Sequence, residues 1–269
     1  MVTPTVAAPA VMARNLMPVN GESLARLEGI AREAGARILE HYHAGVLVEQ
    51  KGDRGPVTAA DRAAHASILA ALTAWDAGVP VISEEGDIPP YAERREWTRF
   101  WLVDPLDGTK EFIHRNGEFT VNVALIESGE PVLGVVYAPA LDLLYLAGKG
   151  LGAWKAEGGG TAVRIQSPAR GAGRRPLVVV ESRSHPSAEL ERYLSTLQVA
   201  RRVQAGSSLK FCWVAEGKAD IYPRLGRTME WDVAAGDCVW RNASREGQNP
   251  SPLTYNTPEL SHDRFVIGL

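Results

Sequence analysis

"WLVDPLDGTKEFI", residues 101–113, ends an apolar run with two aspartates three positions apart, Asp104 and Asp107. Pro105 keeps the residue before it out of the helical region, and Gly108 permits a tight turn. DPLDGT is therefore predicted to be a rigid bend leaving a strand, with both carboxylates facing one small volume. Asp, Pro and Gly are also common in solvated turns, so the motif needs support from elsewhere in the chain.

Three other segments carry acids in similar settings. ISEEG places Glu84 and Glu85 after an apolar run, VTAAD ends in Asp61, and MEWDVAAG places Asp232 at the start of an Ala-rich helix. Taken singly, they are typical of surface acids, a helix N-terminal acid and a helix cap. Lys51 alone is typical of a surface lysine.

As many as five such carboxylates gathered in one pocket indicate a cation site. Like charges at contact distance in a low-dielectric pocket raise one another's pKa by several units unless cations neutralise them. Oxygen ligands without His or Cys favour hard cations, so Mg²⁺ or Mn²⁺ is expected. Two or more such ions suit the hydrolysis of a phosphate ester.

Hydrophobic periodicity predicts the surrounding elements. Apolar residues recur at helical spacing from Ser23 to Ile38 and from Asp61 to Trp75, which indicates two amphipathic helices. Short apolar runs VPVIS and FWLV follow, and then FTVNVALI, PVLGVVYAP, LLYLA and GAWKA, which read as an antiparallel meander.

A stretch rich in Gly, Pro and Arg predicts a domain boundary near residue 170. Beyond it we expect a strand at LVVV, helices from about Ser187 and Ser207, a strand at ADIYP and a helix from Trp231. The expected organisation is a poorly ordered start at 1–20 and two mixed α/β units with a site at their junction, 21–170 and 171–269.

Composition excludes several classes of protein. The 269 residues are 45% hydrophobic and 23% charged with net charge −3, which suits a globular chain and provides no basic stripe for polymeric nucleic acid. Cys212 and Cys238 are expected to be buried thiols in a reducing compartment. No apolar run reaches about 18 residues, so a transmembrane segment is excluded and a cytoplasmic location expected, with peripheral contact at the inner membrane left open.

The four acidic segments, which follow the chain order VTAAD, SEEG, DPLDGT and WDVAAG, resemble the signatures of the inositol monophosphatase superfamily of Mg²⁺-dependent, lithium-sensitive phosphatases. The resemblance runs from about residue 21 to the end. It implies an α/β (α+β layered) fold, an αβαβα sandwich of alternating helix and sheet layers with two subdomains. It also implies two or three Mg²⁺ ions, with Mn²⁺ as a substitute. Whether the chain is a monomer or a homodimer stays open.

The resemblance also implies the ligands. Glu84, Asp104 and the carbonyl of Leu106 match those of a first metal. Asp104, Asp107 and Asp232 match those of a second, and Glu84 would help to hold a third, looser ion and counts among the catalytic groups.

Further roles follow from the same resemblance. Thr109 and Asp61 match the pair that orients the attacking water, and the amides of Gly108 and Thr109 would bind phosphate oxygens. Glu85 and Lys51 are expected to contact the metal ligands without binding the metal themselves.

Within the superfamily, GTKEFI, SRSH, GSSLKFC and ADIYPR resemble the 3'(2'),5'-bisphosphate nucleotidases, which convert 3'-phosphoadenosine 5'-phosphate to AMP and phosphate in sulfur metabolism. The substrate, a small phosphate ester, would be contacted by His185, Ser207, Lys210 and Arg224, and by Asp232. Without the resemblance, His185 is typical of a loop residue and Ser207 of a helix cap. Lys210 is typical of an exposed lysine and Arg224 of a cation at the rim of a pocket.

Three other functions share part of this sequence pattern. A haloacid-dehalogenase-type phosphatase needs DxDGT, and Pro105 stands where its first aspartate would be. A sensor that binds without hydrolysis is disfavoured because Thr109 and Asp61 are both present. An inositol or sugar monophosphate phosphatase stays the runner-up. After AAGDCVW, the sequence lacks the Gly-Gly turn and threonine often seen in the family, which bears on the rear wall of the substrate pocket.

Overall fold

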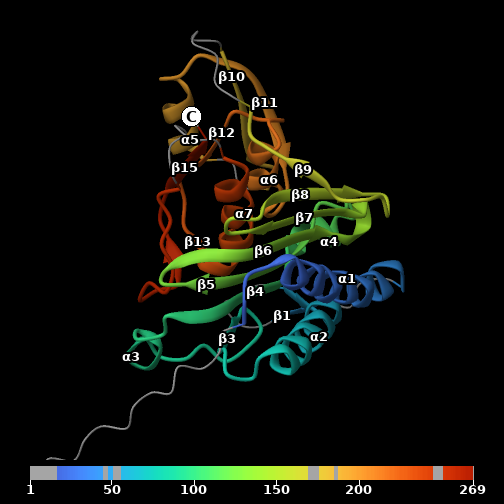
Figure 1. The fold of residues 1–269 in the computed structure, drawn as a ribbon. Coiled ribbons are helices and arrows are strands. Elements are labelled where there is room, and N and C mark those ends of the chain that lie inside the picture. The colour runs from blue at the N-terminus through green and yellow to red at the C-terminus, as the bar shows by residue number, and fades with distance from the viewer. Residues whose placement is uncertain are drawn as a thin grey trace, which may run out of the picture.

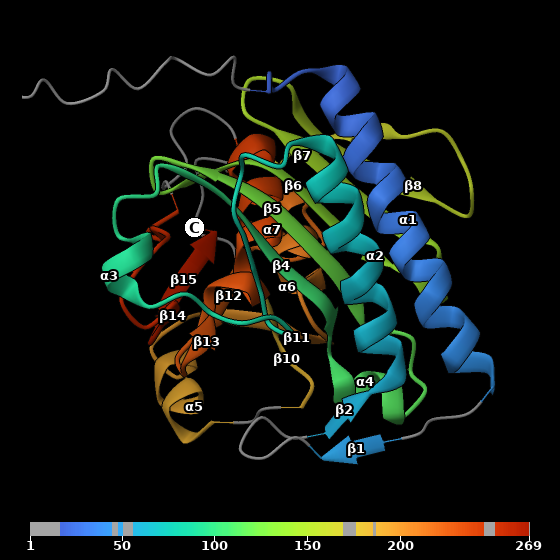
Figure 2. The same ribbon diagram turned by 90° about the horizontal axis from the view of Figure 1, so that it is seen from below.

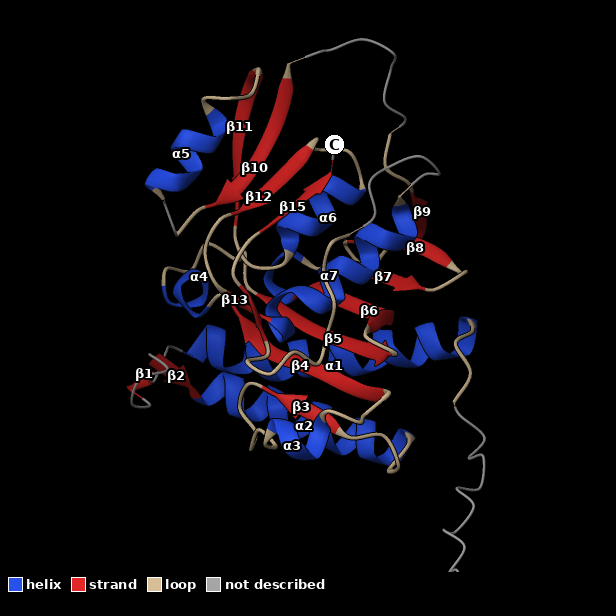
Figure 3. Cartoon of the chain, turned by 90° about the vertical axis from the view of Figure 1, so that its left-hand side faces the viewer, coloured by secondary structure: helices blue, strands red, loops and turns tan. Residues whose placement is uncertain are grey.

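Helices and sheets alternate through five layers in the computed structural model, which describes residues 17–44, 48–50, 56–168, 176–184, 187–244 and 251–268. Two long helices, a seven-stranded sheet, two central helices, a four-stranded sheet and a short outer helix follow one another (Figures 1 and 3). The expected αβαβα order is confirmed.

The large sheet has the strand order β3-β4-β5-β6-β7-β8-β9. β3 is parallel to β4, and each later neighbour is antiparallel, so the predicted meander is confirmed. Helices cover both faces of its middle strands, so these read as continuous apolar runs without alternation. The bounds are β3 Val81–Ser83, β4 Arg99–Asp107, β5 Thr120–Glu127, β6 Glu130–Ala138, β7 Leu143–Gly148, β8 Gly152–Glu157 and β9 Val163–Ile165.

The two predicted amphipathic helices cover one face of this sheet. They are α1 (Gly21–Ala44) and α2 (Ala59–Trp75), which lie side by side across it in Figure 2. Their apolar stripes, including Leu27, Ile38 and Ile68, are buried in one core with the sheet. No described helix is both long and apolar enough to cross a membrane.

The central helices cover the other face. They are α6 (Leu209–Ala215) and α7 (Glu230–Ala243), and α7 lies across the middle strands. At Gly134 in β6, an added Cβ would lie 2.6 Å from the Cβ of Cys238. Glycine is therefore what lets α7 approach the sheet so closely, and both cysteines are buried as expected.

The small sheet has the order β11-β10-β12-β15, with β10 parallel to β11 and β12, and β15 antiparallel to β12. Its outer face is covered by α5 (Ala188–Leu194), which begins where Ser187 Oγ accepts hydrogen bonds from two backbone amides. The bounds are β10 Leu177–Ser182, β11 Val199–Ala205, β12 Ile221–Arg224 and β15 Phe265–Gly268.

Several short elements were not predicted. Strand β11 has the polar sequence VARRVQA at a sheet edge, where the alternation that marks a half-buried strand is missing. The others are β1 Val48–Gln50, β2 Pro56–Thr58, α3 Tyr91–Arg94, α4 Thr109–Ile113, the 3₁₀ turn Pro139–Leu141, β9, β13 Thr228–Met229, β14 Ser261–His262 and β15.

The division into two units stays a prediction. The boundary near residue 170 falls within 169–175, and most of the start at 1–20 falls within 1–16, both outside the described residues. One core cluster spans both sides of the boundary, since it contains Tyr145 of the large sheet and Val180 of the small sheet.

Candidate active site

The DPLDGT bend lies inside β4 as well as at its end. Asp104 pairs with Asn122 and Asp107 with Thr120, so β4 has one more residue than β5 across this stretch and forms a bulge. The amide of Leu106 donates to Asp104 Oδ1 at 3.1 Å, which fixes the bend. The expected end of the strand is therefore corrected: pairing resumes at Asp107.

Gly108 makes the turn that follows. Its φ is +89°, in the left-handed region, and an added Cβ would collide with Ser207 Oγ. Only glycine meets both conditions without strain. The turn thus starts α4 at Thr109, directly against the segment that precedes α6.

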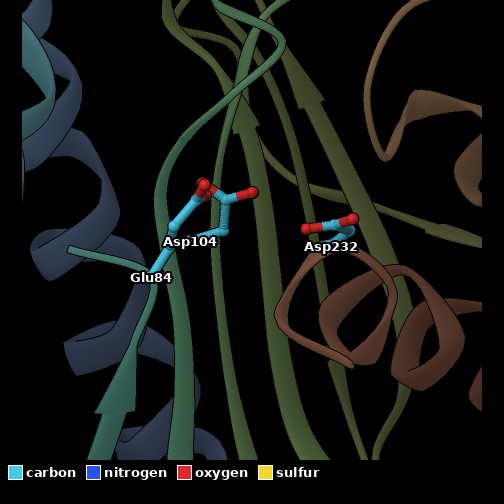
Figure 4. Close-up of side chains that lie close together, drawn as sticks. All are labelled: Glu84, Asp104 and Asp232. Carbon is cyan, nitrogen blue, oxygen red and sulfur yellow. The ribbon is translucent and has the colours of Figure 1, made fainter. Parts of the chain in front are cut away.

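Three predicted ligands converge from separate elements (Figure 4). Glu84 follows β3, Asp104 lies in β4 and Asp232 lies in the first turn of α7, and each offers an oxygen within 4.8 Å of the other two. The parallel pairing of Ser83 with Val103 places Glu84 beside Asp104 at one sheet edge. The closeness of α7 to the sheet supplies the third carboxylate.

The remaining predicted ligands line the same cavity, which has a volume of about 380 Å³. Leu106 and Asp107 are both at its wall. Asp107 Oδ2 accepts from Asn122 Nδ2 and Ser208 Oγ, each at 3.4 Å.

Asp232 is fixed in a capping box at the start of α7. Its Oδ2 accepts from Thr228 Oγ1 at 2.8 Å and from the amide of Met229 at 3.0 Å. Asp232 is thus the third residue of the helix, where the sequence alone had suggested the cap itself.

The carboxylates raise one another's pKa. Burial and the neighbouring acids raise the pKa of Glu84 to about 7 and that of Asp104 well above its usual range. Burial and Asp232 raise the pKa of Asp107 to about 7, and burial raises that of Asp232. The charge of Asp61 adds to the effect on Asp104. A bound cation would relieve the repulsion among these buried carboxylates. Because all the donor atoms are oxygens, the cluster suits Mg²⁺ or Mn²⁺.

The predicted water-orienting pair lies beside this cluster. Asp61 is buried in the first turn of α2, near enough to affect Asp104, and Thr109 lines the cavity with Gly108. Glu85 lines a neighbouring cavity with His65, behind Glu84. Lys51 lies outside the described residues.

Cations and hydroxyls line the same cavity. Lys210 is buried, its Nζ donates to the carbonyl of Ser207, and burial lowers its pKa to about 8. Ser207 Oγ donates to the carbonyl of Asp107 at 2.8 Å, and Arg224 is held by the carbonyls of its own turn. His185 lies outside the described residues.

Several residues that line this cavity were given no role from the sequence. Glu111 is buried, and its Oε1 accepts from Ser184 Oγ, which ties α4 to the end of β10. Glu111 belongs to the KEFI segment, which was used in the sequence only to identify the branch of the family. The other lining residues missed are Lys110, Ser182, Ser208, Phe211, Tyr222, Thr228 and Val233.

The described part of the C-terminal stretch that departs from the family pattern does not line this cavity. None of the described residues 251–268 lines it. They pack instead against Arg94 and against the buried acids of α7. Residues 245–250 of the same stretch lie outside the described residues, so the expected effect on the substrate pocket stays a prediction.

Comparisons with known proteins agree with this geometry. The profile of the inositol monophosphatase family matches residues 21–245. The 3'(2'),5'-bisphosphate nucleotidase CysQ of Salmonella typhimurium is 54% identical over 212 residues, covering 78% of this chain and 83% of that protein. CysQ of Haemophilus influenzae is 34% identical over 258 residues, 94% of each chain.

Solved structures show the same relationship. CysQ from Bacteroides thetaiotaomicron, a bacterial member of the inositol monophosphatase family, has a TM-score of 0.77 and 39% identity, covering 92% of this chain and 97% of that one. The extragenic suppressor protein suhB from Bartonella henselae has a TM-score of 0.69 and 26% identity, covering 83% and 85%.

Proposed function

The chain belongs to the inositol monophosphatase family, and from that premise we propose that it is a Mg²⁺-dependent nucleotidase that hydrolyses 3'-phosphoadenosine 5'-phosphate to AMP and phosphate. It is a phosphoric monoester hydrolase, like the 3'(2'),5'-bisphosphate nucleotidases that are up to 54% identical to it. The observation that carries the proposal is a single cavity lined both by the clustered carboxylates and by buried Lys210.

The metal ligands in this proposal are the converging acids. Glu84, Asp104, Asp107 and Asp232 would hold Mg²⁺ with the carbonyl of Leu106. When bound, the ions would supply positive charge to polarise the phosphate and lower the pKa of a water molecule. The raised pKa values of the carboxylates support this assignment, because such groups gain most from a bound cation.

The chain's own residues would do the positioning. Asp61 and Thr109 would orient the attacking water by hydrogen bonds, and the amides of Gly108 and Thr109 would bind phosphate oxygens. Lys210 and Arg224 would bind the second phosphate of the substrate, with Ser207 beside them. A substrate with two phosphates matches a cavity that contains both the acidic cluster and these cations.

A substrate panel tests the proposal. Purified protein with Mg²⁺ is expected to release phosphate fastest from 3'-phosphoadenosine 5'-phosphate, with inositol 1-phosphate, a sugar monophosphate and AMP as comparisons. Faster release from inositol 1-phosphate would overturn the nucleotidase assignment in favour of the runner-up. Inhibition by lithium at millimolar concentration is also expected, and equal activity with and without lithium would count against that part.

A further inference from the structure

One buried acid of α7 is held by the segment 253–260, which we call the strap. The carboxylate of Glu230 is fully buried, and it accepts from the amides of Asn256 and Thr257, each at 2.8 Å, and from Thr257 Oγ1 at 2.7 Å. The strap thus supplies three donors to one carboxylate at the start of the helix.

A second buried acid lies further along the same helix. Asp237 is also fully buried, and its Oδ2 accepts from Tyr255 Oη and from Arg241 Nε, each at 2.9 Å. Arg241 in turn donates to the carbonyl of Leu253 at 2.6 Å. The two acids share a helix and a partner segment, which makes them a matched pair for comparison.

Arg94 of α3 anchors the other side of the strap. Its side chain is buried, with 2% exposure, and Nη1 donates to Asn256 Oδ1 and to the carbonyl of Thr257, both at 2.8 Å. Nη2 donates to the carbonyl of Pro258 at 2.6 Å, and Nε to that of Pro89 at 3.2 Å. Asn256 Nδ2 returns a hydrogen bond to the carbonyl of Arg94 at 2.7 Å.

The strap also borders the turn that holds Asp232. The amide of Glu230 donates to the carbonyl of Leu260 at 2.8 Å, where the strap ends. The next residues form β14, which pairs with β13. Strand β13 consists of Thr228 and Met229, the two residues that donate to Asp232 Oδ2.

We propose that Arg94 and Glu230 are positioning residues, which act through the strap to set Asp232 against Glu84 and Asp104. Arg94 belongs to the segment that follows Glu84, and Glu230 to the helix turn that carries Asp232. The strap therefore links the segment that follows Glu84 to the helix turn that carries Asp232. Hydrogen bonds suit this positioning role because they are directional and fix the orientation of the groups that they join. Apolar packing could stabilise the strap as well but would fix its orientation less sharply. The inference rests on the proposed metal site.

Paired variants on α7 test it. In full-length protein stripped of metal and titrated with Mg²⁺ by calorimetry, Glu230→Gln is expected to raise the Kd for Mg²⁺ by about tenfold or more. Asp237→Asn removes a similar charge roughly 7.5 Å along the helix from Asp232, and its Kd is expected to stay within about twofold of wild type. Thermal unfolding should show comparable losses for both.

A milder pair covers the case in which Glu230→Gln does not fold. Thr257→Val keeps the volume and loses the hydroxyl, and is expected to weaken Mg²⁺ binding, whereas Thr257→Ser keeps both the hydroxyl and the affinity. Unchanged Kd in Glu230→Gln and Thr257→Val, or an equal loss in Asp237→Asn, overturns the positioning role alone. A wild-type protein that binds no Mg²⁺ overturns the proposed metal site, and this inference with it.

Discussion

Two buried aspartates show how the same residue serves different ends. Asp237 has Arg241 and Tyr255 as partners, so its charge is compensated within the protein. Asp104 is equally buried, but Glu84 and other acids surround it, and its side chain is hydrogen-bonded to that of Glu84, which two ionised carboxylates cannot achieve. At a buried position surrounded by acids, an apolar residue would stabilise the fold more than an aspartate does.

Asp104→Asn is therefore expected to raise the stability of the metal-free protein while abolishing its activity. It removes one charge from a repelling cluster, so the Tm in EDTA at about pH 8 should rise, and phosphate release should fall by about a thousandfold or more. Asp237→Asn is the control and should lower the Tm, because it removes the buried charge that pairs with Arg241 Nε at 2.9 Å. A lower Tm in Asp104→Asn would contradict the account.

Lys210→Met is expected to weaken binding of a bisphosphate. A charge-assisted hydrogen bond in a buried site contributes about 1.5 to 3 kcal/mol, so the KM for 3'-phosphoadenosine 5'-phosphate should rise by about tenfold or more with a smaller effect on kcat. Lys218→Met provides the control, since Lys218 follows the same helix and is half exposed. Equal kinetics for both variants would remove Lys210 from the substrate site.

At the scale of elements, the bulge in β4 and the turn after it set the site. The bulge turns Asp104 and Asp107 toward one cavity, and the turn presses α4 against the segment before α6. Glu118 extends this joint, since it accepts from the amide of Gly206 at 2.8 Å and forms an ion pair with Arg183. Short elements thus hold the segment with the predicted ligands of β4 against the segments that precede α6 and follow β10.

Gly108→Ala tests the role of this turn, with Gly150→Ala as the matched control. Gly108 and Gly150 have φ of +89° and +79°, but only at Gly108 does an added Cβ meet other atoms. Both alanine variants should lose about 1 to 2 kcal/mol of unfolding free energy from the backbone alone. Only Gly108→Ala should also lose most of its phosphate release, and wild-type activity in that variant would show that the turn is dispensable.

Local patterns predicted the long helices, the meander and the acidic motifs, because each depends on spacing within one segment. Arg94 could not be predicted, since AERREWTR reads as a charged surface and only the fold brings it to Asn256. The same applies to β15, whose partner β12 lies far away in the chain. What the sequence lacked was the pairing between distant segments, which no local period encodes.

Across the molecule, the raised pKa values of the acids in the site make its stability depend on pH. The pKa of Glu84 is raised from 4.5 to about 7, and that of Asp107 from 3.8 to about 7. The unfolded chain therefore binds fewer protons than the folded chain between these values, so the stability of the metal-free protein falls as the pH rises through this window.

Mg²⁺ is expected to offset that loss. The increase in Tm on adding Mg²⁺ should be small at about pH 5, where protons occupy the carboxylates, and larger at about pH 8, where the ions meet ionised ligands. Differential scanning calorimetry in EDTA and in Mg²⁺ at the two pH values measures both effects. A Tm increase that does not grow with pH would show that the ions bind elsewhere.

The joining of distant segments at Asp232 also governs how the protein is made. During synthesis, Glu84 and Asp104 leave the ribosome long before α7, and the large sheet can form while the site still lacks its third carboxylate. The strap that holds α7 in place comes later still. At the proposed metal site, an unfinished chain would therefore lack the ligand that Asp232 provides, and we expect it to bind Mg²⁺ only after α7 has packed on the sheet.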